Sequence, residues 1–148
     1  MKTADAGAAW GSAALDDGEF VRRLEACEYP NTIFRHADHV RLAWIYLRRL
    51  GPDQAETRIV ESIRRFAGSL NHPEKYHDTI TRAWLRLVAA AYAATPEIEE
   101  FAAFAATHHR LLDRGGLAPY YSAALLATDA ARQRWVPPDL QPLPAAGR

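Results

Sequence analysis

Apolar residues recur at helical spacing along most of the chain, and no stretch alternates strictly between apolar and polar positions. After Pro52, for example, Ile59, Ile63 and Phe66 fall on one helical face, and charged residues fall on the opposite face. The same pattern predicts helices at about residues 17–27, 37–50, 52–69, 76–94, 96–111 and 119–126, followed by a last short helix at about 129–135. We therefore predict an all-α domain built as a bundle of five to six helices.

Residues with restricted or permissive backbones mark several helix ends. Gly51 followed by Pro52 predicts that one helix ends and the next begins there, since glycine favours the residue after a helix and proline favours its first position. Thr95 followed by Pro96 predicts a further helix start, with Thr95 as its N-cap.

The two ends of the chain have a different composition from the middle. Residues 1–14 are rich in alanine and glycine, and we expect them to be disordered. Residues 137–148 contain four prolines and predict an extended tail. The expected organisation is a disordered segment 1–14, a helical domain 15–136 and a Pro-rich tail 137–148.

Length and charge narrow the classes of function. The chain has 148 residues, 49% of them hydrophobic, and no formal net charge, which is typical of one soluble globular domain. The neutral balance argues against nucleic-acid binding through a basic surface, and the longest apolar run is too short to span a membrane. Cys27 is the only cysteine, which fits a reducing cytoplasm. The strong preference for arginine over lysine indicates a GC-rich bacterial genome.

Three histidines lie where apolar helical stripes begin. His36 and His39 open the helix at 37–50, and His77 opens the helix at 76–94. Short connections make neighbouring helices antiparallel, so both helix starts should lie at one end of the bundle. Stepping back along each stripe places the three imidazoles on the core side. We expect them to line one polar pocket.

This pocket supports two kinds of chemistry. Three neutral imidazoles can bind Zn²⁺, Fe²⁺ or Cu²⁺ and leave a coordination position open, so the sequence predicts a divalent transition metal at His36, His39 and His77. Without a metal, Arg35 and Lys75 beside two helix N-termini would hold an anionic group. A histidine would then act as general acid or base.

Further residues are expected around the ligand. Thr81 and Tyr121 would supply hydroxyl groups, and Trp44 and Trp84 would form apolar walls. Asp38 or Asp78 would orient an imidazole. A purely structural interpretation stays open for each of these residues, because buried histidines are usually hydrogen-bonded to neighbours and acidic residues often cap helices.

Four short motifs are the most specific features of the chain. They are Phe34-x-His36-x-x-His39, Lys75-Tyr76-His77-x-Thr79-x-Thr81, Tyr120-Tyr121-Ser122 and Trp135-x-x-Pro138-Asp139-Leu140-x-Pro142-Leu143-Pro144. Together they resemble a family of small bacterial proteins of uncharacterised function, over nearly the whole chain after residue 16. The resemblance implies a self-contained domain and no particular activity.

The sequence therefore predicts a small cytoplasmic enzyme that acts on an anionic small molecule in a histidine-lined pocket, in a metal-assisted or a metal-free form. Two alternatives stay open. One is a non-catalytic protein that binds a ligand or metal in the same pocket. The other is an interaction module whose Pro-rich tail docks on a partner. A homodimer through exposed aromatic helix faces is a further option.

Overall fold

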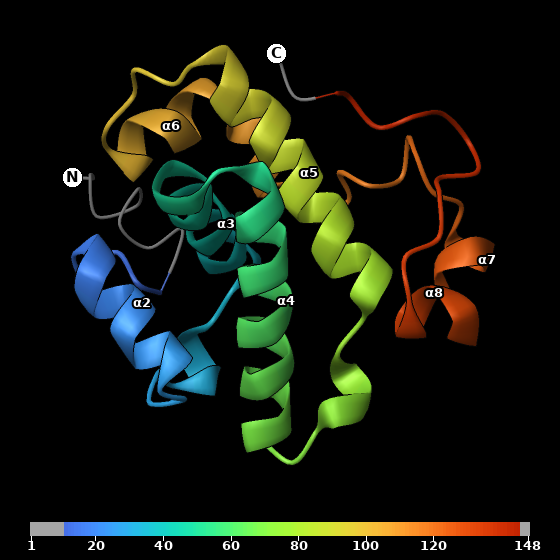
Figure 1. Cartoon of the computed structure of the whole chain (residues 1–148), viewed down its shortest axis with the longest axis horizontal. Coiled ribbons are helices and arrows are strands. Elements are labelled where there is room, and N and C mark those ends of the chain that lie inside the picture. The colour runs from blue at the N-terminus through green and yellow to red at the C-terminus, as the bar shows by residue number, and fades with distance from the viewer. Residues whose placement is uncertain (1–10, 146–148) are drawn as a thin grey trace.

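The computed structural model describes residues 11–145, and within that range it contains helices and connecting segments but no strand. The predicted all-α fold is therefore confirmed (Figure 1). The α-helices are α2 (Asp17–Glu25), α3 (His36–Leu50), α4 (Pro52–Ser69), α5 (Asp78–Ala94), α6 (Phe101–Thr107), α7 (Ala123–Leu126) and α8 (Asp129–Gln133). Three 3-10 helices lie in the connections: η1 (Asn31–Ile33), η2 (Pro73–Lys75) and η3 (His109–Leu112). None of the helices in the described range is long and apolar enough to cross a lipid bilayer.

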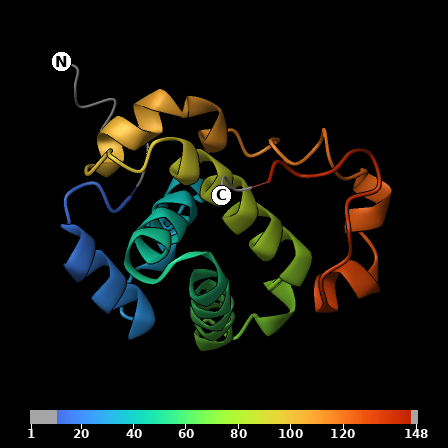
Figure 2. The same cartoon turned by 45° about the horizontal axis from the view of Figure 1, so that its top comes forward.

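The helices α3, α4 and α5 form the centre of the fold, and each packs against the other two. On one side α2 packs against α4, and on the other side α8 packs against α5 (Figures 1 and 2). The axes of α4 and α5 spread apart towards η2, which joins them along the bottom of Figure 1. This divergence matters because the candidate pocket lies between these two helices.

The junction between α3 and α4 has the predicted geometry. Gly51 has a φ of 82°, a left-handed conformation that glycine adopts at little cost. Pro52 is the first residue of α4, where a missing N–H removes no helical hydrogen bond. Because both residues fit their positions, α4 spans Pro52–Ser69, which is the predicted range.

The helix predicted at 96–111 is wrong in its first part. Residues 96–100 form a turn and an extended segment, and α6 begins only at Phe101. The reason is that the hydroxyl of Thr95 serves the preceding helix: it donates to the carbonyl of Ala91 at 3.0 Å and lies 2.9 Å from Nε2 of His108. Thr95 is thus the C-cap of α5 and not the N-cap of α6.

Two other boundaries differ for similar local reasons. The hydroxyl of Ser122 accepts from the N–H of Leu125, so α7 begins at Ala123 and is shorter than the predicted helix 119–126. At the other end of the chain, α2 ends at Glu25, because the backbone turns left-handed at Cys27, whose φ is 60°.

Apolar side chains form two clusters, and α5 lies between them. Leu85 and Val88 belong to the main core, which α2, α3, α4 and α6 complete. On its other face, Trp84 and Leu87 pack with Tyr121 in a second cluster, which the C-terminal segments cover. Because α5 buries two of its faces, apolar residues occur almost all round the helix. A prediction based on a single inward stripe therefore could not account for all of its buried residues.

Residues 11–14, expected to be disordered, belong to the fold. Ser12 is buried, and its N–H and hydroxyl donate to one carboxylate oxygen of Asp38 at 2.9 and 2.6 Å. The other oxygen of this carboxylate accepts from the N–H of Gly11 at 3.0 Å and of Arg35 at 2.9 Å. Asp38 thus caps α3 and also fixes the N-terminal turn. Residues 1–10 of the expected disordered segment lie outside the described residues.

The described part of the Pro-rich segment, residues 137–145, is extended, as predicted, and it packs on its own chain. The N–H and hydroxyl of Ser122 donate to the two carboxylate oxygens of Asp139 at 2.8 and 2.6 Å. The N–H of Leu140 donates to the carbonyl of Tyr120 at 3.0 Å, and Leu143 contacts the second cluster. These contacts run through residue 143, so the segment is part of the fold along most of its length.

Candidate functional site

A pocket of about 340 Å³ lies between the diverging parts of α4 and α5, with η1, η2 and the start of α3 around it. The apolar lining residues are Phe34, Ile63, Phe66, Ala67, Leu70 and Ile80. The polar and mixed lining residues are Asn31, His39, His72, Lys75, Tyr76, His77 and Thr81.

His39 carries the most unusual polar atom of this pocket. Its ring is mostly buried, and Nε2 is shielded from solvent without a hydrogen-bond partner among the described residues. A buried polar atom with no partner costs free energy, of the order of 1–3 kcal/mol. Because Nε2 is shielded from solvent while the pocket is empty, a molecule in the pocket would not contact it.

Burial also fixes the charge of His39. Loss of hydration lowers the pKa of His39 to about 3, and the neighbouring His36 contributes in the same direction. The imidazole is therefore neutral at neutral pH. A general acid or base works best with a pKa near the working pH, so His39 in the unliganded protein is suited to hydrogen bonding and poorly suited to proton transfer.

His77 lines the same pocket, but both of its ring nitrogens are occupied. Nδ1 accepts from the backbone N–H of Ile80 at 3.1 Å, which makes His77 the N-cap of α5. Nε2 lies 2.8 Å from the carbonyl of Leu126, a bond that requires the proton on Nε2. The ring is thus held as a neutral tautomer that joins α5 to the end of α7.

His36 lies in a different environment. Its Nε2 lies 2.9 Å from the carbonyl of Leu111, and its ring meets Trp84 edge-on with centroids 4.3 Å apart. Burial is the largest influence on His36 and lowers its pKa. The opening that His36 borders also contains Arg35 and Arg114, and the residues around it differ from those around His39 except for Phe34.

The expected convergence of all three imidazoles on one pocket therefore does not occur. Within residues 11–145, no group of three or more His, Cys, Asp or Glu side chains is arranged to hold a metal ion. To bind a metal, His77 would have to give up a helix cap or a bond to another helix. A divalent metal at His36, His39 and His77 stays a prediction of the sequence.

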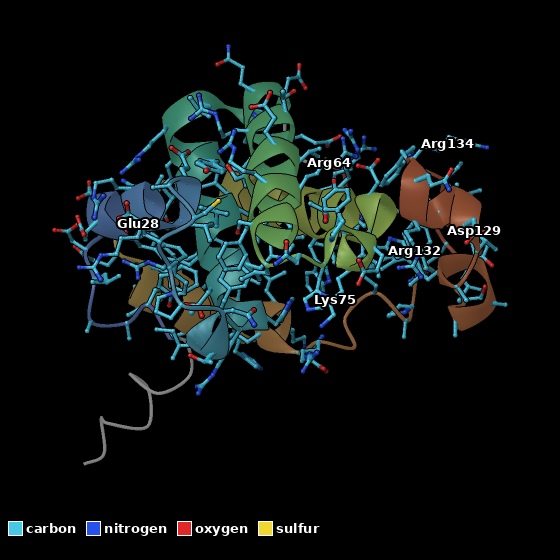
Figure 3. All side chains as sticks on the ribbon, turned by 90° about the horizontal axis from the view of Figure 1, so that it is seen from below. Glu28, Arg64, Lys75, Asp129, Arg132 and Arg134 are labelled. Carbon is cyan, nitrogen blue, oxygen red and sulfur yellow. The ribbon has the colours of Figure 1, made fainter. Side chains whose placement is uncertain are left out.

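Two of the predicted ligand-binding residues do lie at the pocket. Lys75 is exposed at its rim, at the end of η2. Thr81 is buried beside it, and its hydroxyl donates to the carbonyl of His77 at 2.8 Å. Thr81 therefore shapes the wall, whereas Lys75, labelled in Figure 3, is exposed and is the only lysine within residues 11–145.

The other predicted ligand-binding residues lie elsewhere. Trp44 is in the main core, between Phe101 and Phe104, and Trp84 is in the second cluster. The hydroxyl of Tyr121 donates to the carbonyl of Val136 at 2.7 Å. Arg35 borders the opening of His36. The helical pattern placed Trp44 and Trp84 on inward faces, but it could not say which of two clusters each face would meet.

The two aspartates expected to orient an imidazole have other partners. Asp38 accepts from backbone and hydroxyl groups of residues 11, 12 and 35. Asp78 is buried and accepts from the hydroxyl of Tyr76 at 2.7 Å and from Nε of Arg82 at 2.8 Å. Both carboxylates therefore stabilise helix starts and do not touch a histidine.

The sequence analysis did not predict that the residues forming the apolar walls of the pocket would be functional. Phe34, Phe66 and Leu70 form much of the lining. The helical period did place Phe66 on the inward face of its helix, but a period does not distinguish a packed core from the wall of a cavity. The phenylalanine of the first motif, Phe34, was the one available signal.

Comparison of the chain with protein-family models, with curated proteins and with solved structures finds no match. Any function must therefore be argued from the geometry of the site itself.

Proposed function

We propose that this protein binds a small, largely apolar molecule in the pocket around His39. The observation that carries the proposal is the pocket of about 340 Å³ itself, whose walls include the apolar side chains of Phe34, Ile63, Phe66 and Leu70. Pockets of a few hundred Å³ with apolar walls and few polar groups are typical small-molecule sites.

Binding has more support than acid–base catalysis. Burial lowers the pKa of His39 to about 3, and no carboxylate of residues 11–145 is hydrogen-bonded to its ring. His77 is fixed by two hydrogen bonds, and His36 borders another opening. The enzyme predicted from three convergent histidines would need at least one of them free to exchange a proton near neutral pH.

The expectation of an anionic ligand rests on fewer residues than the sequence suggested. Lys75 lines the pocket, but Arg35 borders the opening of His36. We propose that a negative charge on the ligand would lie at the rim beside Lys75, where it stays partly hydrated. The inner part of the pocket favours neutral groups, because burying an ion without a counter-charge is costly.

A fragment screen followed by NMR tests this proposal. The protein is labelled with ¹⁵N, and neutral and anionic fragments are added at millimolar concentration. We expect at least one fragment to shift the ring signals of His39 and the amides of residues 63–70 in a saturable manner. The ring signals of His39 report on a side chain that lines the pocket, so they separate binding in the pocket from binding to the surface.

A pair of variants controls this experiment. Ala67→Phe fills part of the pocket and should weaken binding at least tenfold, whereas Ala106→Phe adds the same ring at an exposed position of α6 and should have no effect. Both variants are first checked for a folded spectrum. The proposal fails if no fragment perturbs the pocket of the folded protein, or if the fragments bind both variants equally well.

A further inference from the structure

We infer that Phe34 sets the upper limit on the length of the ligand in the His39 pocket, so that the pocket takes compact apolar molecules and excludes long alkyl chains. The inference rests on the function proposed above and adds a specificity-determining residue and the shape of the ligand. It follows from the place of Phe34, which forms part of the pocket wall and also borders a second opening.

Phe34 is shared by two openings of the molecule. The second one, the His36 opening, has a volume of about 540 Å³ and is lined by Phe34, Arg35, His36, Ala37, Leu112 and Arg114. Among the described residues, Phe34 is the only one that lines both this opening and the His39 pocket. Asn31 and His39, on either side of it in the chain, belong to the pocket alone. Phe34 therefore lies where the two spaces adjoin.

The other large aromatic side chains of the pocket wall are backed by packed structure. Phe66 is buried in the main core, and Tyr76 is buried with its hydroxyl donating to Asp78 at 2.7 Å. Phe34 is only half-buried, and its ring centroid lies 6.0 Å from that of Tyr29 and 5.2 Å from that of Phe66. A smaller residue in place of Phe34 would therefore extend the pocket towards the His36 opening.

The backbone around Phe34 is held without the help of its ring. The N–H of Phe34 donates to the carbonyl of Asn31 at 3.2 Å. The N–H of Arg35 donates to the carboxylate of Asp38 at 2.9 Å, a bond that fixes the start of α3. Because neither bond involves the phenyl ring, a smaller side chain changes the wall of the pocket and leaves these bonds in place.

A fixed wall limits the length of a flexible ligand. Each methylene group that moves from water into an apolar site improves affinity about three- to fourfold. A methylene group that would have to overlap the ring of Phe34 stays in water and adds nothing. The affinity of a series of alkyl chains should therefore rise with length and then level off, so the pocket favours compact ligands.

Straight-chain primary alcohols from butanol to decanol test this limit. They are titrated into the ¹⁵N-labelled full chain, and binding is followed by the ring signals of His39 and the amides of residues 63–70. We expect the affinity for the wild type to level off within the series. In Phe34→Ala the rise should continue for at least two further methylene groups. Phe34→Val should extend it by at least one, and it provides the same test if the alanine variant does not fold.

Tyr92→Ala is the matched control. Tyr92 is also half-buried and packs against the main core, but it does not line the pocket. Removal of its ring should leave the limit where it is in the wild type. This variant therefore separates a specific change in the wall from a general loosening of the core.

A comparison of decanol with decanoate tests the direction in which the pocket extends. In Phe34→Ala a long chain reaches the His36 opening, where a carboxylate would lie beside Arg114. Decanoate should then bind up to about fivefold more tightly than decanol. Arg114→Met, added to Phe34→Ala, should remove this difference.

Several results would overturn the inference. One is an affinity that still rises at decanol in the wild type; others are an unchanged limit in the folded Phe34 variants, a limit that moves equally in Tyr92→Ala, and no effect of Arg114→Met on decanoate. If fragments bind the pocket but no alcohol does, the inference fails while the proposed binding function stands. If neither fragments nor alcohols bind, the proposed function fails as well.

Discussion

Burial of His39 makes the stability of the fold sensitive to acid. An imidazole in an unfolded chain ionises near pH 6.5, whereas burial lowers the pKa of His39 in the folded protein to about 3. Between these two values the unfolded state binds more protons than the folded state. The free energy of unfolding therefore decreases as the pH falls from about 6.5 towards 3, by up to about 1.4 kcal/mol per pH unit for this one group.

Replacement of His39 should remove that part of the acid sensitivity. We expect the free energy of unfolding of His39→Phe, measured by urea denaturation between pH 7 and pH 4, to fall less steeply with acid than that of the wild type. His109→Phe removes an exposed imidazole instead and should keep the steeper profile. Identical slopes for the wild type and His39→Phe would show that His39 is not held neutral by the fold.

His77 should contribute to stability because its two nitrogens bond to two different elements. In His77→Ala the N–H of Ile80 loses its cap and the carbonyl of Leu126 loses its donor, so we expect a loss of about 1–3 kcal/mol in the free energy of unfolding. His77→Asn can still cap the helix but cannot reach Leu126. It should be less destabilised than the alanine variant, and equal losses in urea denaturation would contradict the capping role.

The site could be predicted from the sequence only in part. Helical spacing predicted that His39 and His77 lie at one end of the fold, and both residues line the same pocket. Spacing could not show that His77 would use both nitrogens in hydrogen bonds, since its partner Leu126 is distant in sequence. It also could not show that the ring of His36 would turn towards Trp84.

At the scale of elements, α5 connects the two apolar clusters. The packing of the second cluster on its outer face depends on Gly116. A Cβ atom built on Gly116 would lie 2.7 Å from Cη2 of Trp84 and 3.2 Å from the carbonyl oxygen of Asp113. The loop before α7 therefore approaches Trp84 more closely than any residue with a side chain could. This close approach closes the second cluster over α5.

Two glycine substitutions should consequently have opposite effects on stability. Gly116→Ala forces Trp84 or the loop to move and should lower the free energy of unfolding by about 1–3 kcal/mol. Gly68→Ala lies in α4 with no neighbouring atom within 4 Å of the new Cβ, and should raise it by about 0.5–1 kcal/mol. Thermal and urea denaturation of both variants would measure this, and a neutral Gly116→Ala would mean that the loop is not tightly packed.

Helix boundaries could be predicted where a residue type is favoured at only one position relative to a helix end. Gly51 and Pro52 fix the start of α4, because few other backbone conformations suit them in that order. Thr95 was misread because a threonine hydroxyl can cap the start of one helix or bond back into the end of another. The structure shows that it bonds to Ala91 and His108, and the second partner lies on a later element that local sequence could not reveal.

For the whole molecule, the C-terminal segment should act as a structural part that is separate from the pocket. A chain without residues 138–148 loses the pair between Ser122 and Asp139, the bond from Leu140 to Tyr120, and the packing of Leu143. We expect its melting temperature to fall by roughly 5–10 °C. Fragment binding at the His39 pocket should persist, because none of its lining residues is removed.

This truncation also distinguishes the alternatives for the tail. If the segment served only to dock on a partner, its removal would leave the melting temperature unchanged. If the pocket depended on the tail, fragments that bind the full chain would no longer shift the signals of His39. Either result would contradict the division between pocket and second cluster described above.

All lining residues of the pocket come from residues 31–81, so one contiguous stretch of the gene encodes its specificity. Recombination within that stretch alone could exchange one ligand preference for another. The C-terminal part, which holds the opposite face of α5, would be inherited unchanged and would continue to support the fold during such an exchange.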